Sequence, residues 1–372
     1  MSQPVQDRKR LIQLFTQFAA IDGVSLAERE IAQSVIGLLQ AAGIRVVEDD
    51  AARRIGGTVG NLLCFPPDFR PGRPAVMLTA HLDTVLPTKK LKPIVSEERI
   101  SSDGSTILGG DNRLGVTILI SLLLATTEGQ RSYKNYFVAF TVAEEIGLRG
   151  ATAMNLTPYN VRSAFVFDCS KRPGIYIKEC VGLALFNARF VGKAAHAGVA
   201  PEEGINAIGL AGAGISKLRM GRVDEDTTVN IGRISGGEAS NVVPDKVEIR
   251  GEVRSFRMSR IRGELRHIER TLSEAALGGG KLLFETKDDF EPYAHADTTP
   301  IVLEVERALK RVSLSPQPIR YTGGSDANVY NARGIPAINL GIGAQKPHSF
   351  QEFILIEDLV KSAEIAFSLV TE

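Results

Sequence analysis

The sequence predicts an α/β fold in which helices cover both faces of a sheet, with a smaller α+β unit inserted into it. Three observations lead to this prediction. The chain has 372 residues, which exceeds the roughly 250 to 300 residues at which a single core usually stops growing. Buried strands alternate with helices in the first and last parts of the chain. Between them, the strands change to an alternating apolar and polar pattern.

The first third begins with an amphipathic helix within residues 1–20, which we interpret as part of the fold and not as a signal peptide. A second helix is predicted from "SLAERE", where Ser25 and Glu28 have capping-box spacing, as far as Gly43. Strands follow at 74–80, 135–142 and 163–168, and a long, almost wholly apolar helix is predicted at 114–129. Apolar strands of this length are typical of a sheet that is buried on both faces.

The middle of the chain has a different character. The runs "GLALFNARFVG", "TTVNIGRISGG" and "KVEIRGEVRSF" alternate apolar and polar residues, as half-exposed antiparallel strands do. With two helical segments at 204–220 and 259–277, they predict a four-stranded antiparallel sheet covered by two helices. Helix, strand and helix patterns return at 299–312, 336–343 and 356–370. We therefore expect one domain from 1–180 and 291–372, and an inserted domain at 181–290.

Charge and cysteine content exclude several classes of partner. The 44 Lys and Arg residues nearly balance the 43 Asp and Glu residues, so we expect neither nucleic acid nor a membrane surface as a partner. No run approaches the roughly 18 apolar residues of a membrane span. Cys64, Cys169 and Cys180 are an odd, sparse set without CxxC spacing, which favours reduced thiols and a cytoplasmic location.

Polar residues follow the predicted strands of the larger domain. In open α/β sheets, ligands bind beyond the carboxyl ends of the strands. Five separate segments bring a histidine or a carboxylate to this edge. These candidate residues are His81, Asp83, Asp111, Glu144, Glu145, Asp168 and His348.

Such a set of side chains favours a divalent metal ion. Several carboxylates in a partly dry crevice repel one another unless cations neutralise them. Imidazole and carboxylate ligands suit zinc, cobalt or manganese. Cys169 could supply a thiolate, but its side chain is expected to leave the strand on the side opposite to Asp168, so we interpret it as a packing residue. Taken one at a time, these carboxylates are more often helix caps or turn formers.

Two short patterns suggest separate roles within the set. His81 and Asp83 are two residues apart, so in an extended segment Asp83 can accept the second imidazole N–H of His81. A hydrogen-bonded surface turn is the ordinary alternative. Glu144 and Glu145 are adjacent, so in an extended segment they point in opposite directions. If Glu145 binds a metal, Glu144 is free to act as a base; the alternative is a solvated acidic strand end.

Six motifs follow one another along the chain, namely "AHLDTV", "GGDNRLG", "AEEIGLRGA", "FVFD", "GKAAHAGVAPEEGINAI" and "KPHSFQEFI". In this order they resemble those of the co-catalytic di-zinc exopeptidase family that includes peptidase T, glutamate carboxypeptidase and acetylornithine deacetylase. The peptidase T-like branch is the most similar one. They extend from residue 80 to the last helix, so the resemblance covers nearly the whole chain.

The resemblance implies a mixed-sheet catalytic domain with an inserted lid and dimerisation domain, and two zinc ions per chain. By this resemblance His81 and Asp168 bind one zinc, Asp111 bridges both ions, and Glu145 and His348 hold the second. Glu144 is the implied general base and Asp83 the residue that orients His81. In the lid, the resemblance implies His196 as the oxyanion donor, commonly from the partner subunit, and Asn241 and Arg254 as substrate-binding residues. Asp326, in "GGSDAN", matches a substrate-pocket loop.

The resemblance leaves three functional hypotheses. The first is a metallopeptidase of small peptides, in particular a tripeptide aminopeptidase that works as a homodimer. The second is a carboxypeptidase or an N-acyl-amino-acid deacylase on the same zinc core. The third, from a different class, is a non-catalytic binding module. This last reading requires a missing ligand or base, and none is missing from the motifs.

Overall fold

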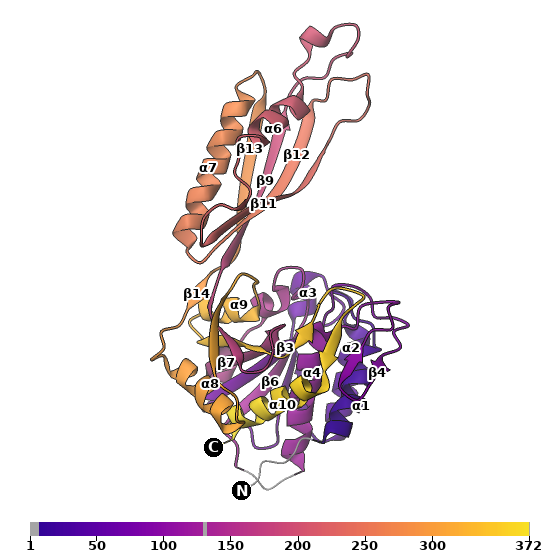
Figure 1. Cartoon of the computed structure of the whole chain (residues 1–372), viewed down its shortest axis with the longest axis vertical. Coiled ribbons are helices and arrows are strands. Elements are labelled where there is room, and N and C mark those ends of the chain that lie inside the picture. The colour runs from indigo at the N-terminus through magenta and orange to yellow at the C-terminus, as the bar shows by residue number, and fades with distance from the viewer. Residues whose placement is uncertain (1–6, 129–131, 372) are drawn as a thin grey trace. The chain divides into compact units, whose positions relative to one another are not determined.

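The computed structural model describes residues 7–128 and 132–371, which divide into two compact units (Figure 1). The large unit comprises the segment that ends at Lys178, the segment Ala294–Arg320 and the segment that begins at Ser325. The inserted unit comprises Glu179–Tyr293 together with the short segment Tyr321–Gly324. Sequence patterns placed the insertion at 181–290 and gave no signal for the second, separate segment.

The large unit is built on a mixed sheet, as predicted. Its order in the described residues is β1-β2-β6-β3-β7-β16-β8-β14, with β15 pairing with β8. The four neighbours β6, β3, β7 and β16 run parallel, whereas β1, β2 and β8 pair antiparallel. The bounds are β1 Arg45–Glu48, β2 Leu62–Phe65, β3 Ala75–His81, β6 Tyr136–Thr141, β7 Val161–Cys169, β8 Ile175–Cys180, β14 Tyr293–Ala294, β15 Gln317–Tyr321 and β16 Ala337–Gly341.

Helices cover both faces of this sheet, which confirms the predicted fold class (Figure 1). The long apolar helix α4 packs on β3, β6 and β7, and α1, α2 and α10 contact it. Helix α9 packs on β7 and β16 and contacts α5, which in turn contacts α3. The bounds are α1 Arg8–Ala19, α2 Arg29–Ala41, α3 Ala51–Ile55, α4 Gly110–Thr127, α5 Arg149–Ala153, α8 Pro300–Arg311, α9 Asp326–Ala332 and α10 Ile356–Val370.

The parallel core explains why the central strands are continuous apolar runs. Every residue of β3, β6 and β16 is buried, because helices lie on both sides of these strands. A small second sheet lies beside α4, in the order β17-β18-β5-β4. Its strands are β4 Ile94–Val95, β5 Arg99–Ser101, β17 Ala344–Gln345 and β18 Phe353–Leu355. The loop between β17 and β18 carries His348.

The inserted unit is an antiparallel sheet with two helices, as predicted. Its four long strands are joined at the edge by the two-residue strand β10, in the order β10-β11-β12-β9-β13. Both helices pack on the sheet and on each other. One face of β9 and β12 is buried and the other partly exposed, as their alternating sequences indicate. The bounds are β9 Gly182–Val191, α6 Ala207–Ile215, β10 Gly221–Arg222, β11 Thr227–Gly236, β12 Lys246–Ser255, α7 Met258–Ala276 and β13 Lys281–Phe290.

Two further features bear on the sequence-based expectations. Within the described parts of the chain, no helix has both the length and the apolar character that a membrane crossing requires. All three cysteines are free and buried.

Candidate metal centre

The structure brings the five predicted metal ligands of the large unit together at one edge of its sheet. His81 ends β3, Asp168 lies near the end of β7, and Asp111 lies at the start of α4. Glu145 follows β6, and His348 lies in the loop between β17 and β18. His81, Asp111 and Glu145 each offer a ligand atom, and these atoms all lie within 4.8 Å of one another.

Asp111 occupies the middle of this cluster. Its Oδ1 lies 3.1 Å from His81 Nε2, and its Oδ2 lies 3.2 Å from His348 Nε2. On one side, His81 Nε2 is also 3.2 Å from Asp168 Oδ1. On the other side, His348 Nε2 is 3.0 Å from Glu145 Oε1. Asp111 thus lies between two groups of donors, and each of its carboxylate oxygens is close to one of these groups.

The electrostatics of the cluster favour a cation between these donors. Burial opposes a charge on the His81 ring, but contacts with Asp111 and Asp168 raise its pKa well above the usual value. Contacts with Asp111 and Glu145 raise the pKa of His348 to about 10. Both shifts arise because the carboxylates stabilise positive charge among them. A divalent metal ion satisfies the same requirement, and the imidazole and carboxylate donors suit one.

Asp83 orients His81 through two of its oxygen atoms. The His81 Nδ1 atom lies 3.0 Å from the backbone carbonyl oxygen of Asp83 and 3.4 Å from its Oδ1. Both acceptors favour a proton on Nδ1. The lone pair of Nε2 then points toward the carboxylates of Asp111 and Asp168.

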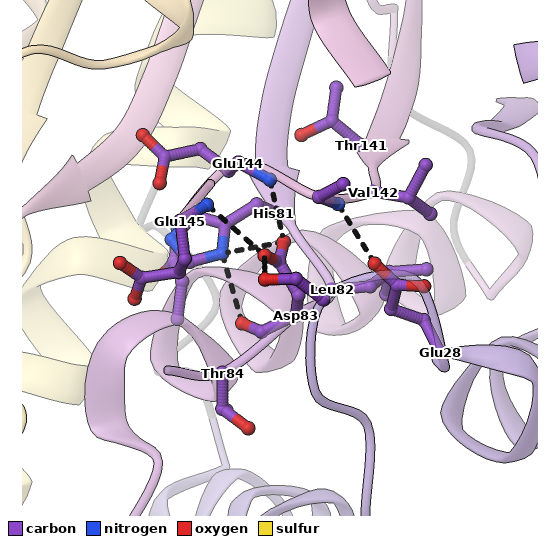
Figure 2. A network of polar contacts seen from close by, with 12 residues as sticks. Glu28, His81, Leu82, Asp83, Thr84, Thr141, Val142, Glu144 and Glu145 are labelled. Carbon is purple, nitrogen blue, oxygen red and sulfur yellow. Dashed lines mark hydrogen bonds and ion pairs between the residues drawn. The ribbon is translucent and has the colours of Figure 1, made fainter. Parts of the chain in front are cut away.

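The Asp83 carboxylate also fixes the two adjacent glutamates (Figure 2). Its Oδ1 accepts the Glu144 N–H at 3.0 Å, and its Oδ2 accepts the Glu145 N–H at 3.1 Å. The Ser25 hydroxyl donates to the same Oδ2 at 2.6 Å. Asp83 is fully buried, so this carboxylate is a fixed point shared by His81 and both glutamates.

Glu144 and Glu145 do not extend the strand, and this part of the prediction is wrong. Strand β6 ends at Thr141, and Ala143 has a φ of 52°. The N–H groups of Gly147 and Leu148 donate to the Glu144 carbonyl at 3.0 and 2.8 Å, which closes a turn. The chain can leave the sheet here because buried carboxylates accept the N–H groups that a neighbouring strand would otherwise bind.

The two glutamates nevertheless differ in their surroundings. The Glu145 carboxylate contacts His348, as described above. Burial raises the pKa of Glu144 well above its usual value; the positive charge of His81 acts in the opposite sense, and the negative charge of Asp168 adds to the increase. A carboxyl group whose pKa is raised by burial is a candidate for proton transfer.

Glu28 is a site residue that sequence reasoning assigned to another role. The predicted capping box is wrong, because α2 begins at Arg29 without a side-chain cap and Ser25 bonds to Asp83 instead. Glu28 is fully buried, and its Oε1 accepts the N–H groups of Leu26 at 3.0 Å and Ala143 at 2.8 Å. Glu28 and Asp83 together therefore bind three successive N–H groups, from Ala143 to Glu145.

Arg113 is a second residue that the motifs did not single out. Its side chain is fully buried, and its guanidinium donates to the carbonyl oxygens of Leu82 and Ile21. The first of these carbonyls lies between His81 and Asp83 in the chain, so Arg113 ties helix α4 to the segment after β3. A buried arginine with backbone acceptors has no local sequence signature.

Asp326 lies in the large unit, at the start of α9. Its side chain is 2% exposed, and its Oδ2 accepts the Thr141 hydroxyl at 2.6 Å. Burial raises the pKa of Asp326 to about 7. The Asp326 side chain therefore contacts the end of β6, and its role toward a substrate stays a prediction. Cys169, the alternative ligand, is buried, and burial raises the pKa of its thiol to about 12, which disfavours a thiolate.

The other three predicted residues belong to the inserted unit. His196 is exposed, and its Nδ1 accepts the N–H groups of Gly198 at 3.2 Å and Val199 at 3.1 Å. Its neutral ring therefore carries the proton on Nε2. Asn241 is a neighbour of His196, because its carbonyl accepts the Ala197 N–H at 2.9 Å. Arg254, on β12, forms a two-pronged ion pair with Glu252 at 2.8 and 3.2 Å.

Comparison with protein families gives two matches. Residues 179–279 match a model of the M20 peptidase dimerisation domain. Residues 94–173 match a model of M42 glutamyl aminopeptidase. The first match covers most of the inserted unit, and the second covers Asp111, Glu144, Glu145 and Asp168.

Three relatives are similar over nearly the whole chain. A Bacillus subtilis protein, YqjE, described as uncharacterized, is 33% identical over 98% of this chain and 99% of its own length. The crystal structure of the aminopeptidase PepT from Bacillus cereus is 32% identical, with a TM-score of 0.88 over 98% of each chain. That of a tripeptidase from Staphylococcus aureus is also 32% identical, with a TM-score of 0.90 over 98% of each chain.

Proposed function

Because this chain belongs to the M20 peptidase family, in its peptidase T-like branch, we propose that it is a metal-dependent aminopeptidase that acts on tripeptides. The observation that carries the proposal is the central position of Asp111. One of its oxygens faces the His81 and Asp168 side, and the other faces the Glu145 and His348 side. This division of donors is what a pair of metal ions requires.

We propose two zinc ions as the cofactor, with cobalt or manganese as substitutes. His81 and Asp168 would hold one ion, Glu145 and His348 the other, and Asp111 both. Bound divalent ions would polarise the scissile carbonyl and acidify the attacking water. No cysteine thiolate is needed for this donor set, which agrees with the buried Cys169 thiol.

Glu144 is the proposed general base. Its backbone N–H donates to Asp83, and the contact with His348 is made by the carboxylate of Glu145. Glu144 would take a proton from the attacking water and return it to the amine that leaves. Asp83 contributes indirectly, because it holds the tautomer of His81 and the backbone of Glu144 at the same time.

The inserted unit contributes substrate-binding groups in this proposal. The Nε2–H of His196 is a donor suited to a developing oxyanion, since the Nδ1 atom is already occupied by backbone N–H groups. Asn241, next to it, is a second polar group for the substrate. Arg254 would have to exchange its pairing with Glu252 to bind a carboxylate. The match to a peptidase dimerisation domain supports a homodimer formed through this unit.

A substrate panel tests the proposal. Tripeptides, dipeptides, N-acetylated tripeptides and N-acyl amino acids are incubated with the zinc-loaded protein, and the released amino acids are identified. We expect release of the amino-terminal residue from free tripeptides and little cleavage of the N-acetylated ones. Preferred cleavage of N-acyl amino acids, or release from the carboxyl end, would contradict aminopeptidase action.

A further inference from the structure

Glu352 connects the two loops that carry Asp111 and His348. It lies four residues after His348, in the loop between β17 and β18. Its Oε2 accepts the Gly109 N–H at 2.8 Å, and its Oε1 accepts the Asp111 N–H at 3.2 Å. The side chain is 1% exposed. Both carboxylate oxygens therefore accept backbone N–H groups of the segment that carries Asp111.

The residues around Glu352 favour its contact with the segment that carries Asp111. Its carbonyl accepts the Ser102 N–H at 3.1 Å, and its own N–H donates to Ser349 at 3.1 Å. Gly110 lies against the carboxylate, since a Cβ atom at this position would be 3.0 Å from Glu352 Oε1 and 3.2 Å from Ile354 Cγ2. The glycine thus permits the close approach, and a side chain there would push the two loops apart.

We infer that Glu352 is a positioning residue that fixes the His348 loop relative to Asp111 and thereby sets the affinity of the second metal site. The inference rests on the proposed function, because the metal centre is part of that proposal. The hydrogen bonds of the Glu352 carboxylate go to the backbone N–H groups of Gly109 and Asp111. Glu352 acts through the backbone of Asp111 on one side and through its own loop on the other.

The first metal group has separate supports. His81 is held by Asp83. Asp168 accepts the Asn112 amide at 3.2 Å and the Asn339 amide at 3.4 Å. The donor group with His348 depends on Glu352 through both His348 and Asp111, whereas the first group depends on it only through Asp111. Loss of Glu352 should therefore weaken the second ion more than the first.

A simpler role would be to cap helix α4, because Gly109 and Asp111 lie at its start. A cap affects stability, whereas a positioning residue affects the two metal sites unequally. The unequal loss is the result that separates the two roles.

Glu352→Gln tests the inference with little change of shape. An amide keeps one acceptor oxygen, but in either orientation its NH₂ group faces one of the two N–H groups. We expect the affinity for the second zinc ion to fall about 10- to 100-fold, the usual range when a supporting partner of a ligand is lost. The measurement is a stepwise zinc titration of metal-free protein against a chromogenic chelator, without substrate.

Asp49→Asn is the matched control. The Asp49 carboxylate also accepts backbone N–H groups, from Ala51 at 2.9 Å and Asn61 at 2.8 Å, in a loop that carries no proposed ligand. This variant should bind both ions as the unchanged protein does, even if its melting temperature falls. Gly110→Ala is a second variant that keeps Glu352 but displaces it, and it should show the same selective loss of the second ion.

The inference is overturned if Glu352→Gln binds the second ion normally, if it loses both ions equally, or if Asp49→Asn shows the same loss. If Glu352→Gln does not fold, the Gly110→Ala titration decides in the same way. Because no substrate is present, these outcomes are independent of the peptidase assay. A protein that binds two ions but cleaves no peptide would refute the proposed function and leave this inference intact.

Discussion

Glu144 and Glu145 are neighbours in the chain, yet each has a different set of partners. Both backbone N–H groups bind Asp83, which fixes the pair as one turn. Only the Glu145 carboxylate contacts His348. The sequence predicted different surroundings for these two side chains, but for the wrong reason. It assumed an extended strand, whereas their different contacts arise in a turn that two buried carboxylates support.

Substitutions of Glu144 and of Glu145 should therefore differ in their effects on kcat and on metal content. Glu144→Gln is expected to keep its metal and to lose about 10²- to 10⁴-fold in kcat, the range for loss of a general base. Glu145→Gln should lose the ion on the His348 side. Metal content by mass spectrometry and kcat on a tripeptide check both. Equal metal loss in the two variants would contradict the assignment.

His348 should make the stability of the metal-free protein depend on pH. Its contacts with Asp111 and Glu145 raise its folded-state pKa to about 10, from an ordinary value of 6.5. A raised pKa means that the folded state binds the proton more tightly than the unfolded state does. The stabilisation is thus complete below about 6.5 and is lost as the pH rises through about 10.

Urea unfolding of metal-free protein across this pH range measures the effect. The difference in the free energy of unfolding between the unchanged protein and His348→Asn should be largest at the acidic end and should shrink as the pH rises. A difference that grows with pH would show that His348 is not held as a cation between these carboxylates.

Elements were predicted most reliably where the pattern was long and the contacts local. Helix α7 and the strands of the inserted unit follow from periodicity, and helix α4 follows from its long apolar run. The failures lie where a distant residue competes for a local group. Ser25 and Glu28 have capping-box spacing, yet they bind Asp83 and Ala143, which are far away in the sequence. Nothing in a local pattern reveals such a contact.

Glu28 gives a prediction for the turn that follows β6. Glu28→Ala leaves the buried Ala143 N–H without its acceptor and should lower the free energy of unfolding by about 1–3 kcal/mol, the cost of an unsatisfied buried group. Glu28→Gln retains an acceptor oxygen and should lose less. Glu30→Ala, an exposed position in the adjoining helix α2, is the control. Chemical denaturation of the three variants compares them, and equal losses for Glu28→Ala and Glu30→Ala would contradict the proposed contact.

In the molecule as a whole, the sequence predicted two domains and their types but not how the strands are ordered. The change from continuous to alternating apolar strands reflects real differences in burial between the two sheets. The segment Tyr321–Gly324, which belongs to the inserted unit, has no distinct pattern because it is only four residues long. Strand order depends on pairing between distant segments, which single-sequence patterns do not record.

The inserted unit gives a prediction about the assembly. If the chain forms a dimer in which His196 acts on the partner's centre, two inactive variants should complement each other. Mixtures of His196→Ala and Glu144→Gln, refolded or exchanged together, are expected to regain tripeptide cleavage, because a mixed dimer contains one site with both groups intact. Dimers that form without any recovery would indicate that His196 acts within its own chain.

The central claim is that a metal centre organised around Asp111 cleaves short peptides. The most direct measurement is a zinc titration of metal-free protein with tripeptide cleavage recorded at each step. We predict no cleavage without metal, and full cleavage only after about two equivalents per chain, as a shared two-metal site requires. Full activity in the presence of excess chelator, or saturation at about one equivalent, would contradict this account.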